Sequence, residues 1–546
     1  MKRVLPHPVR ETRPALWRSL DELSSSPDFA AKLEREFPQG ASEWNGGELS
    51  RRNFLQLMGG SMALAGIGLT GCRRPEAYLV AFTQGAEWTI PGKFLYYATT
   101  MPRRNGAMPL IATTSDGRPT KLEGNPLHPI SNGATDTFAQ ASVLELYDPN
   151  RSKTIKVGGV KTDAAALGAK LDEIAASAHG GEGLAFLVEH VDSPTRDRLL
   201  GQLREKFPNL LWAEYEPLGT GETTAATAAC FGGKVSVIPD FSRADKVLAV
   251  DSDFLNASFS GLDQVRGFMA RRRVSEPGQA MNRLYVAETH YSSTGGLADH
   301  RLRIKPSETG AFLRALGKQV AAMTGNGGLA SVVAAFPDSP LSADPEWIAE
   351  CAKDLAASAG KSVIVVGDQQ PAAVQALGLA INTALGAPGR TLRGLRTEAP
   401  PAATIGELAA AMQAGRVQNL FILGGNPVYN APADLRFGDL LSGVPVTVRL
   451  GSYEDETSAA CQWHVPQAHY LESWGDARSA DGTICAVQPM ILPLWDGVAE
   501  VEILNRLAGK EEPIGPQLVR ETFARIAGGG DLEAKWTEFL RQGFLP

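Results

Sequence analysis

The stretch NLFILGGNP, residues Asn419–Pro427, decides the fold of this 546-residue chain. Its apolar, β-prone run Leu420–Leu423 predicts a buried strand, and two glycines and an asparagine follow at the strand end. A helical pattern, PADLRFGDLLSG at 432–443, comes next. A buried strand, a glycine turn and then a helix are typical of a parallel β-sheet with crossover helices.

The same alternation runs outward from this stretch in both directions. It predicts an α/β fold with doubly wound parallel sheets. The glycine- and alanine-rich stretch 325–343 interrupts the pattern, so we expect two α/β units, 156–325 and 326–470, followed by a C-terminal segment, 471–546, that completes the fold. The other predicted strands are LAFLVEH (184–190), LLWAEYE (210–216), DKVLAVDSD (245–253), RLYVAETH (283–290), HRLRIKP (300–306), SVIVVGD (362–368) and VPVTVRL (444–450).

Polar residues and glycines follow several of these strands. Asp251 ends the run VLAVD, Thr294 follows YVAETH, and Gly424, Gly425 and Asn426 follow LFIL. In parallel α/β sheets, ligands bind in the crevice outside the carboxyl ends of the strands, and glycines there allow close approach. These residues therefore predict a ligand-type crevice, and the alternative is a set of tight turns without a ligand.

The cysteines and histidines exclude the common local metal motifs. The chain has five cysteines, no two closer than 24 residues, so it contains no CxxC pair and no local iron–sulfur motif. His464 and His469 are five residues apart, whereas two ligands on one helix face need a spacing of three or four. We expect no metal site in this chain.

Charge also limits the function. The net charge is −7, and no block of five like charges is present, which excludes an electrostatic nucleic-acid surface. The short basic run Arg271–Arg273 predicts only a solvated helix end.

An export signal is predicted about fifty residues into the chain, in SRRNFLQLMGGSMALAGIGLTGC, residues 50–72. A twin arginine precedes Leu57–Gly71, fifteen uncharged residues, which suit a signal core and are too few for a membrane span. The pattern matches the receptor-read twin-arginine route. The residues that carry the match are Arg51, Arg52, Phe54 and Leu55.

The end of this run predicts lipid attachment. Leu69–Cys72, LTGC, resembles a bacterial lipobox, in which Cys72 would be the acylated first residue of the mature chain. The alternative is a buried apolar helix in which Cys72 has no role. Whether the leader, 1–72, is cleaved stays open.

Several segments together resemble a known family. The leader, with ALWRSLDEL, LEREFPQGASEW and SRRNFLQLMG, resembles the extended twin-arginine leader of the B subunit of alternative complex III, a quinol-oxidising membrane complex of bacteria. The rest resembles molybdopterin oxidoreductases, which implies their fold, with 73–155 as a small N-terminal region. The matching segments are SDGRPTKLEGNPLHPISNGATD (115–136), ADHRLRIKPSETGAFLRAL (298–316), LFILGGNPVYNAPA (420–433) and ESWGDARSADGTICAVQP (472–489).

The resemblance implies a crevice that has lost its cofactor. In the enzymes a cysteine cluster holds an iron–sulfur centre before the DGR segment, but residues 95–118 here contain no cysteine. The enzymes' metal ligand lies in the stretch that corresponds to GTGETTAATAACFGG, where we expect Cys230 to be a small buried thiol and not a ligand. The predicted vestigial pterin-type crevice comprises Asp251, Thr294, Asp299, Gly424, Gly425 and Asn426.

The resemblance thus implies a cofactorless, non-catalytic structural subunit of a quinol-oxidising complex, without molybdopterin or a 4Fe-4S cluster of its own. The implied partners are an iron–sulfur ferredoxin-like subunit or fused half, a multihaem cytochrome c subunit and quinol-binding integral membrane subunits, on the periplasmic face of the membrane. This chain would supply the molybdopterin-like half alone. Two alternatives stay open: an active molybdopterin enzyme with an oxygen ligand from residues 220–227, and a protein that binds another small ligand in the crevice.

Overall fold

A computed structural model describes residues 90, 92–104, 106–219, 221–233, 235–256, 261–396, 400–510 and 515–546. All of them lie in one compact unit, Ala86–Pro546. The predicted export residues Arg51, Arg52, Phe54 and Leu55 and the predicted lipidation site Cys72 lie outside the described residues. What the sequence predicts for the leader therefore stays a prediction.

The larger sheet has eight strands in the order β14-β7-β6-β15-β16-β17-β4-β5. The pairings from β14 to β17 are parallel, and β4 and β5 extend the sheet in antiparallel fashion. The strands are β4 (Lys156–Val157), β5 (Val160–Lys161), β6 (Leu184–Val188), β7 (Leu211–Glu214), β14 (Ala403–Thr404), β15 (Asn419–Leu423), β16 (Val446–Gly451) and β17 (Trp463–Pro466).

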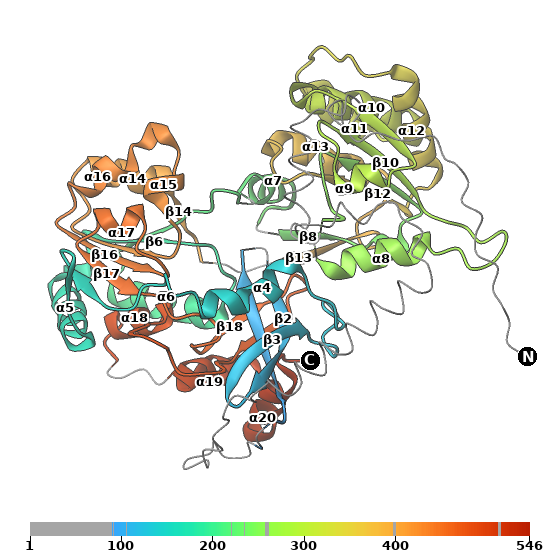
Figure 1. Ribbon diagram of the computed structural model, residues 1–546. Coiled ribbons are helices and arrows are strands. Elements are labelled where there is room, and N and C mark those ends of the chain that lie inside the picture. The colour runs from blue at the N-terminus through green and yellow to red at the C-terminus, as the bar shows by residue number, and fades with distance from the viewer. Residues whose placement is uncertain are drawn as a thin grey trace, which may run out of the picture. The chain divides into compact units, whose positions relative to one another are not determined.

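Helices cover both faces of this sheet, because alternate residues of its strands point to opposite sides. Phe186 and Phe421, whose rings stack with centroids 5.0 Å apart, belong to the core beneath one face. Leu187 and Ile422, one residue further along each strand, belong to the core beneath the other. Figure 1 shows the two helical layers, which are α5 (Ala164–Ser177), α6 (Pro194–Lys206) and α18 (Glu500–Leu507) on one side and α14 (Ile405–Gln413) and α16 (Phe437–Leu441) on the other.

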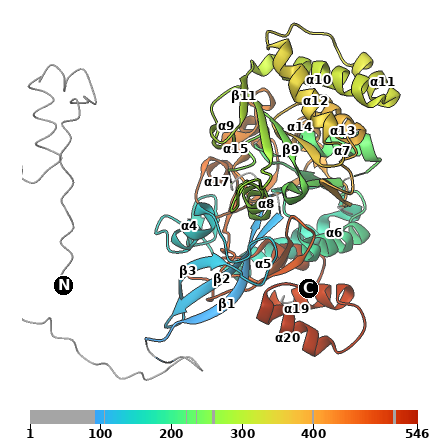
Figure 2. The same cartoon turned by 90° about the vertical axis from the view of Figure 1, so that its right-hand side faces the viewer.

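The second sheet is parallel throughout, in the order β11-β10-β9-β12. Its strands are β9 (Lys246–Val250), β10 (Arg283–Glu288), β11 (His300–Arg303) and β12 (Ser362–Val366). Figure 2 shows helices gathered beside β9, and the cores assign them to faces. One face carries α10 (Thr309–Thr324), α11 (Gly327–Ala335), α12 (Pro345–Ala357) and α13 (Ala372–Ala384), and the other carries α8 (Leu262–Arg272).

Smaller elements complete the described fold. An antiparallel sheet of β1 (Leu95–Arg103), β2 (Gly106–Ser115) and β3 (Arg118–Gly124) packs against α4 (Thr137–Leu146). The hairpin β18 (Gly475–Arg478) and β19 (Ile484–Val487) packs with α19 (Gly515–Ile526) and α20 (Leu532–Gln542). The remaining elements used below are α7 (Gly221–Phe231), β8 (Val235–Pro239), α9 (Ser293–Gly296), β13 (Leu392–Arg396), α15 (Pro427–Asn430) and α17 (Glu456–Ala460).

The predicted α/β fold with parallel sheets is confirmed, and so are most of the local elements. Helix α6 begins at a Ser-Pro pair, where the Ser193 side chain accepts a hydrogen bond from the Arg196 N–H and Pro194 occupies the first position. The helix predicted over 432–443 is interrupted. A short 3₁₀ turn, Ala433–Leu435, precedes α16, and Arg436 between them has a φ of 47°.

The division at residue 325 does not coincide with the two sheets. In the large sheet β6 pairs with β15, and in the second sheet β9 pairs with β12, so each sheet combines strands from both sides of that boundary. The stretch expected to separate the units contains helix α11, whose Leu329 and Val333 lie in the core beside α10. The composition of 325–343 therefore marks a connection inside one helical layer, because crossover topology and not chain order decides which strands pair.

Candidate functional site

The carboxyl end of β9 is held by hydrogen bonds within the protein. Asp251 has a φ of 49°, a conformation that aspartate tolerates better than most residues, and its N–H donates to the Ala287 carbonyl over 2.8 Å. Its carboxylate accepts hydrogen bonds from the side-chain amides of Gln369 (2.9 Å) and Gln370 (2.8 Å). The predicted crevice residue Asp251 is therefore at the expected strand end, and its carboxylate is occupied by two glutamines.

Thr294 lies at the same edge and closes it further. Both its N–H and its hydroxyl donate to Asp253 Oδ1, over 2.8 and 2.7 Å, and the hydroxyl accepts from the Leu255 N–H. Thr294 is fully buried. The side chain predicted to meet a ligand thus fixes the loop after β9 to the start of α9.

A third carboxylate at this edge, Glu288 at the end of β10, is also buried and paired. It accepts from the Ser292 hydroxyl over 2.5 Å and forms an ion pair with Arg301 over 2.5 Å. A Cβ atom at Gly295 would lie 1.9 Å from a carboxylate oxygen of Glu288. The glycine after this strand therefore makes room for a side chain of the protein itself.

Asp299 does not belong to this crevice, so that prediction is corrected. It directly precedes β11, and its N–H donates to the carbonyl of Leu284, near the start of β10. Because β10 and β11 are parallel, Asp299 lies at the amino edge of the sheet, opposite Asp251. Its carboxylate forms a two-pronged ion pair with Arg272, so the basic run 271–273 is not a simply solvated helix end.

The loop after β15 shows the same self-contained arrangement in the large sheet. Gly424 and Gly425 have φ values of 81° and 67°, which glycine adopts readily. A Cβ at Gly424 would lie 2.2 Å from a carboxylate oxygen of Glu189, the residue that follows β6. The Gly425 N–H donates to the same carboxylate. A neighbouring glutamate thus occupies the space that the two glycines leave.

Arg449 in β16 satisfies the carbonyls of this loop. The residue is 2% exposed, and Nη1 donates to the carbonyls of Gly424 (2.6 Å) and Leu450 (2.7 Å). Nη2 donates to the Gly425 carbonyl and pairs with Asp455 over 2.9 Å. The predictions from sequence missed both Arg449 and Glu189. The available signal for Arg449 was a lone arginine inside the apolar strand pattern VPVTVRL.

Asn426 completes the loop through α17. Its side-chain oxygen accepts from the Thr457 hydroxyl over 2.6 Å, and its amide group donates to Glu456 over 2.7 Å. Gly424, Gly425 and Asn426 are therefore together at the carboxyl edge, as predicted, and their polar groups are engaged with other parts of the chain.

The side chains beyond the carboxyl ends of β6 and β7 are mainly acidic. Burial raises the pKa of Glu189, Glu216 and Glu500. Arg196, which lies over the Trp212 ring at 5.3 Å, balances part of this charge through an ion pair with Glu500 at 3.3 Å. A phosphate group at this edge would meet carboxylates, so these residues do not fit the pyrophosphate of a pterin nucleotide.

The stretch that corresponds to the enzymes' metal ligand forms helix α7. Cys230 is exposed there, so the prediction of a small buried thiol is wrong. The helix lies beside β8 and α13, and its buried side is made by Ala226 and Thr227. Thr220 lies outside the described residues, and the Thr223 hydroxyl donates to Asp368 over 3.2 Å.

His464 and His469, the two histidines closest in sequence, lie in the protein interior. His464 is buried with Nε2 2.7 Å from the Ser152 hydroxyl, and burial lowers the pKa of His469 to about 4. Among the described residues, no three or more His, Cys, Asp or Glu side chains are grouped so that they could hold a metal ion. The same described part contains no helix long and apolar enough to cross a membrane.

Comparison with a solved structure identifies the class of fold. The structure is similar to acetylene hydratase from Pelobacter acetylenicus, with a TM-score of 0.56 and 14% identity over 76% of this chain and 68% of that one. The predicted molybdopterin-oxidoreductase-like fold is thereby confirmed.

A sequence relative agrees with this class. The chain is 26% identical over 517 residues to the menaquinone reductase, molybdopterin-binding-like subunit, of Nitratidesulfovibrio vulgaris, covering 85% of this chain and 72% of the relative. No protein-family profile matches the sequence. The chain is a molybdopterin oxidoreductase-like protein, as its resemblance predicted.

Replacing Arg449 tests whether the loop after β15 depends on its guanidinium. Arg449→Met removes the donor to the carbonyls of Gly424 and Gly425 and the cation that pairs with Asp455, so we expect the free energy of unfolding to fall by about 3 kcal/mol. Arg436→Ala is the control, because that arginine is exposed and its ion pair with Asp439 lies at the surface. It should change stability by less than about 0.5 kcal/mol in chemical denaturation. An equally small effect of Arg449→Met would contradict the assigned role.

Asp197, in the first turn of α6, provides a pH test. Burial raises its pKa to about 6, and the charge of Asp192 adds to the rise. Since this value exceeds the unfolded pKa of about 3.9, the group stabilises the fold below about pH 4, and that contribution is lost as the pH rises through 6.

We therefore expect Asp197→Asn to raise the free energy of unfolding by about 1 kcal/mol at neutral pH and to give no gain near pH 4. Asp434→Asn, at an exposed position, is the matched control. A gain that is independent of pH would contradict the assigned pKa.

Proposed function

We propose that this chain is a structural subunit of a membrane-bound quinone oxidoreductase complex, in which it positions redox-active partner subunits and carries no cofactor. The observation that carries the proposal is the occupation of both carboxyl edges by the protein's own groups. Asp251, Thr294 and Glu288 are bonded within the chain at one edge, and Glu189 and Arg449 close the loop after β15 at the other.

The quinone part of the proposal comes from the relative. That protein is a menaquinone reductase subunit described as molybdopterin-binding-like. The leader with Arg51, Arg52 and Cys72 adds the expectation of twin-arginine export, lipid attachment and a place on the periplasmic face. We propose more specifically that the complex is an alternative complex III that oxidises quinol. Its other subunits would be iron–sulfur, haem and integral membrane proteins.

A subunit of this kind needs surfaces for its partners, and α4 offers one. Phe138 and Leu144 on this helix are 61% and 71% exposed, and Tyr147 just after it is 41% exposed. Tyr96 and Tyr97 at the start of β1 are also exposed. Exposed aromatic side chains are enriched at protein interfaces. We propose α4 as a partner-facing element.

Cofactor content is the direct test of the proposal. We expect elemental analysis of the protein purified with its native partners, then separated from them under mild conditions, to find substoichiometric molybdenum and tungsten in this chain. Oxidation of an extract of the separated chain should release no fluorescent pterin. Stoichiometric metal with a released pterin would contradict the proposal and favour an active molybdopterin enzyme.

Acidic substitutions on α4 test whether this helix contacts partner subunits. We expect Phe138→Asp combined with Leu144→Asp to abolish co-purification of the partner subunits, because both side chains would lose apolar contact area. The unfolding free energy of the isolated chain should change by no more than about 0.5 kcal/mol per substitution, since both positions are exposed. Val332→Asp, at an apolar position of α11 that is 43% exposed, is the control. Retention of every partner by the double variant would remove α4 from the interface.

A further inference from the structure

A cavity of about 590 Å³ lies along helix α6. Its walls come from α6, α19, β13, β18 and the turn between β18 and β19, and none of the predicted crevice residues lines it. The volume falls in the range of sites for small molecules. Its lining is therefore a site candidate separate from the crevice.

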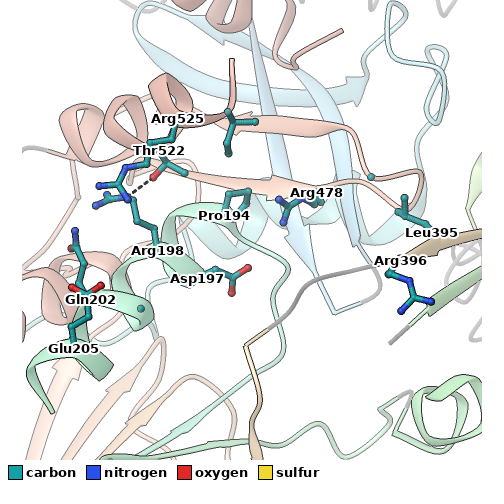
Figure 3. A pocket seen from close by; sticks show the side chains of 13 residues that line it. Pro194, Asp197, Arg198, Gln202, Glu205, Leu395, Arg396, Arg478, Thr522 and Arg525 are labelled. Atoms are coloured by element: carbon teal, nitrogen blue, oxygen red, sulfur yellow. Dashed lines mark hydrogen bonds between the residues drawn. The ribbon is translucent and has the colours of Figure 1, made fainter. Parts of the chain in front are cut away.

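Four arginines from four elements surround this cavity. Figure 3 shows Arg198 of α6, Arg396 of β13, Arg478 of β18 and Arg525 of α19 around it. Guanidinium groups supply paired N–H donors that match the oxygens of phosphate and carboxylate groups. These arginines from separate parts of the chain give the lining of the cavity the chemistry of an anion site.

Two of these arginines have their charge compensated inside the protein. Arg198 donates to the Thr522 hydroxyl over 2.8 Å and lies 3.2 Å from Glu521, and Arg478 pairs with Asp192 over 3.0 Å. These contacts fix the two guanidinium groups in place. Fixed donors bind a ligand at a smaller entropic cost than free ones.

The other two arginines are available to a ligand. Within the described residues, Arg525 has no hydrogen-bond or ion-pair partner, and Arg396 makes one long hydrogen bond, 3.4 Å, to the Phe231 carbonyl. The positive charge of Arg525 lowers the pKa of Arg198, together with the larger effect of burial. An anion between Arg198 and Arg525 would replace this repulsion by two charge-assisted hydrogen bonds.

The remaining lining adds a hydrogen-bond acceptor and free space. Gln202 Oε1 is buried and has no hydrogen-bond partner. A Cβ at Gly201, on the same helix, would have nothing within 4 Å. The carboxylates of Asp197 and Glu205 also line the cavity and can accept hydrogen bonds. A ligand here therefore needs an anionic group for the arginines and a hydroxyl group for the acceptors.

We propose that this cavity binds a phosphate ester that carries a hydroxyl group, with the phosphate between Arg198 and Arg525 and the hydroxyl toward Gln202. A tetrahedral phosphate accepts from several guanidinium groups at once, whereas a carboxylate is satisfied by one. A soluble sugar or glycerol phosphate and a phospholipid headgroup share this chemistry.

The test is titration calorimetry of the chain with glycerol 3-phosphate, with acetate and glycerol as comparison ligands. We expect saturable binding of glycerol 3-phosphate alone, weakened about tenfold by Arg525→Ala through the loss of charge-assisted hydrogen bonds. Arg393→Ala is the matched control, because Arg393 is exposed on the same strand as Arg396 and does not line the cavity. Equal binding of acetate, or an equal loss in Arg393→Ala, would overturn the assignment.

A second variant separates binding from folding. Gly201→Met places a side chain in the cavity at a helical position, where methionine favours the helix more than glycine does. It should abolish binding without lowering the thermal midpoint, and undiminished binding would overturn the proposal.

Vesicles identify the source of the ligand. A lipid headgroup would be assigned if the chain binds phosphatidylglycerol vesicles but not phosphatidylcholine vesicles, and if Arg525→Ala reduces that binding. Binding of glycerol 3-phosphate alone would assign a soluble ester, and binding of neither would overturn the proposal.

Discussion

The arrangement of the large sheet depends on one buried cation, the guanidinium of Arg449. A buried cation is stabilised when its donors are paired, and Arg449 is 2% exposed. Its two Nη groups donate to three backbone carbonyls and to Asp455, and its Nε has no hydrogen-bond partner within the described residues. The carbonyls of Gly424 and Gly425 belong to the loop after β15, and the carbonyl of Leu450 belongs to β16. Contacts within the protein therefore hold the loop after β15 in its shape.

In the second sheet, different residues form internal hydrogen bonds and ion pairs at the strand ends. There, Asp251, Asp253 and Glu288 are the anions, and glutamine, threonine, serine and arginine side chains supply the donors. In both sheets the strand ends carry carboxylates where a nucleotide would bring phosphates. Like charges repel strongly in a partly buried crevice, so the electrostatics of both edges favour the closed arrangement. Internal hydrogen bonds therefore engage polar groups at the strand ends of both sheets.

The sequence carries much of this fold and part of the site, for physical reasons. Apolar runs such as LFIL and VLAV predict buried strands, and the residues that follow them, Gly424 and Asp251, lie at the carboxyl edges. Sequence position also contained the evidence against Asp299, since a residue that precedes a parallel strand lies at the amino edge.

Other features depend on contacts between distant segments and have no local signal. Glu189 meets Gly424 across 235 positions of sequence, and the pairing of β6 with β15 follows from crossover topology. The exposure of Cys230 depends on which face of α7 packs against α13, which the alanine- and threonine-rich pattern of that helix does not specify. Local sequence therefore predicts elements better than it predicts their neighbours.

Helix α6 connects the closed edge to the arginine-lined cavity. Arg196 and Arg198 are two residues apart, and side chains at that spacing point about 200° apart around a helix. Arg196 accordingly lies over Trp212 among the carboxylates of the sheet edge, whereas Arg198 lines the cavity with Gln202. The edge is mainly acidic, while the cavity includes Arg525, for which the described residues supply no hydrogen-bond or ion-pair partner. One side of α6 therefore faces the carboxylates of the sheet edge, which repel anions. The other side faces the arginine-lined cavity that we propose binds a phosphate.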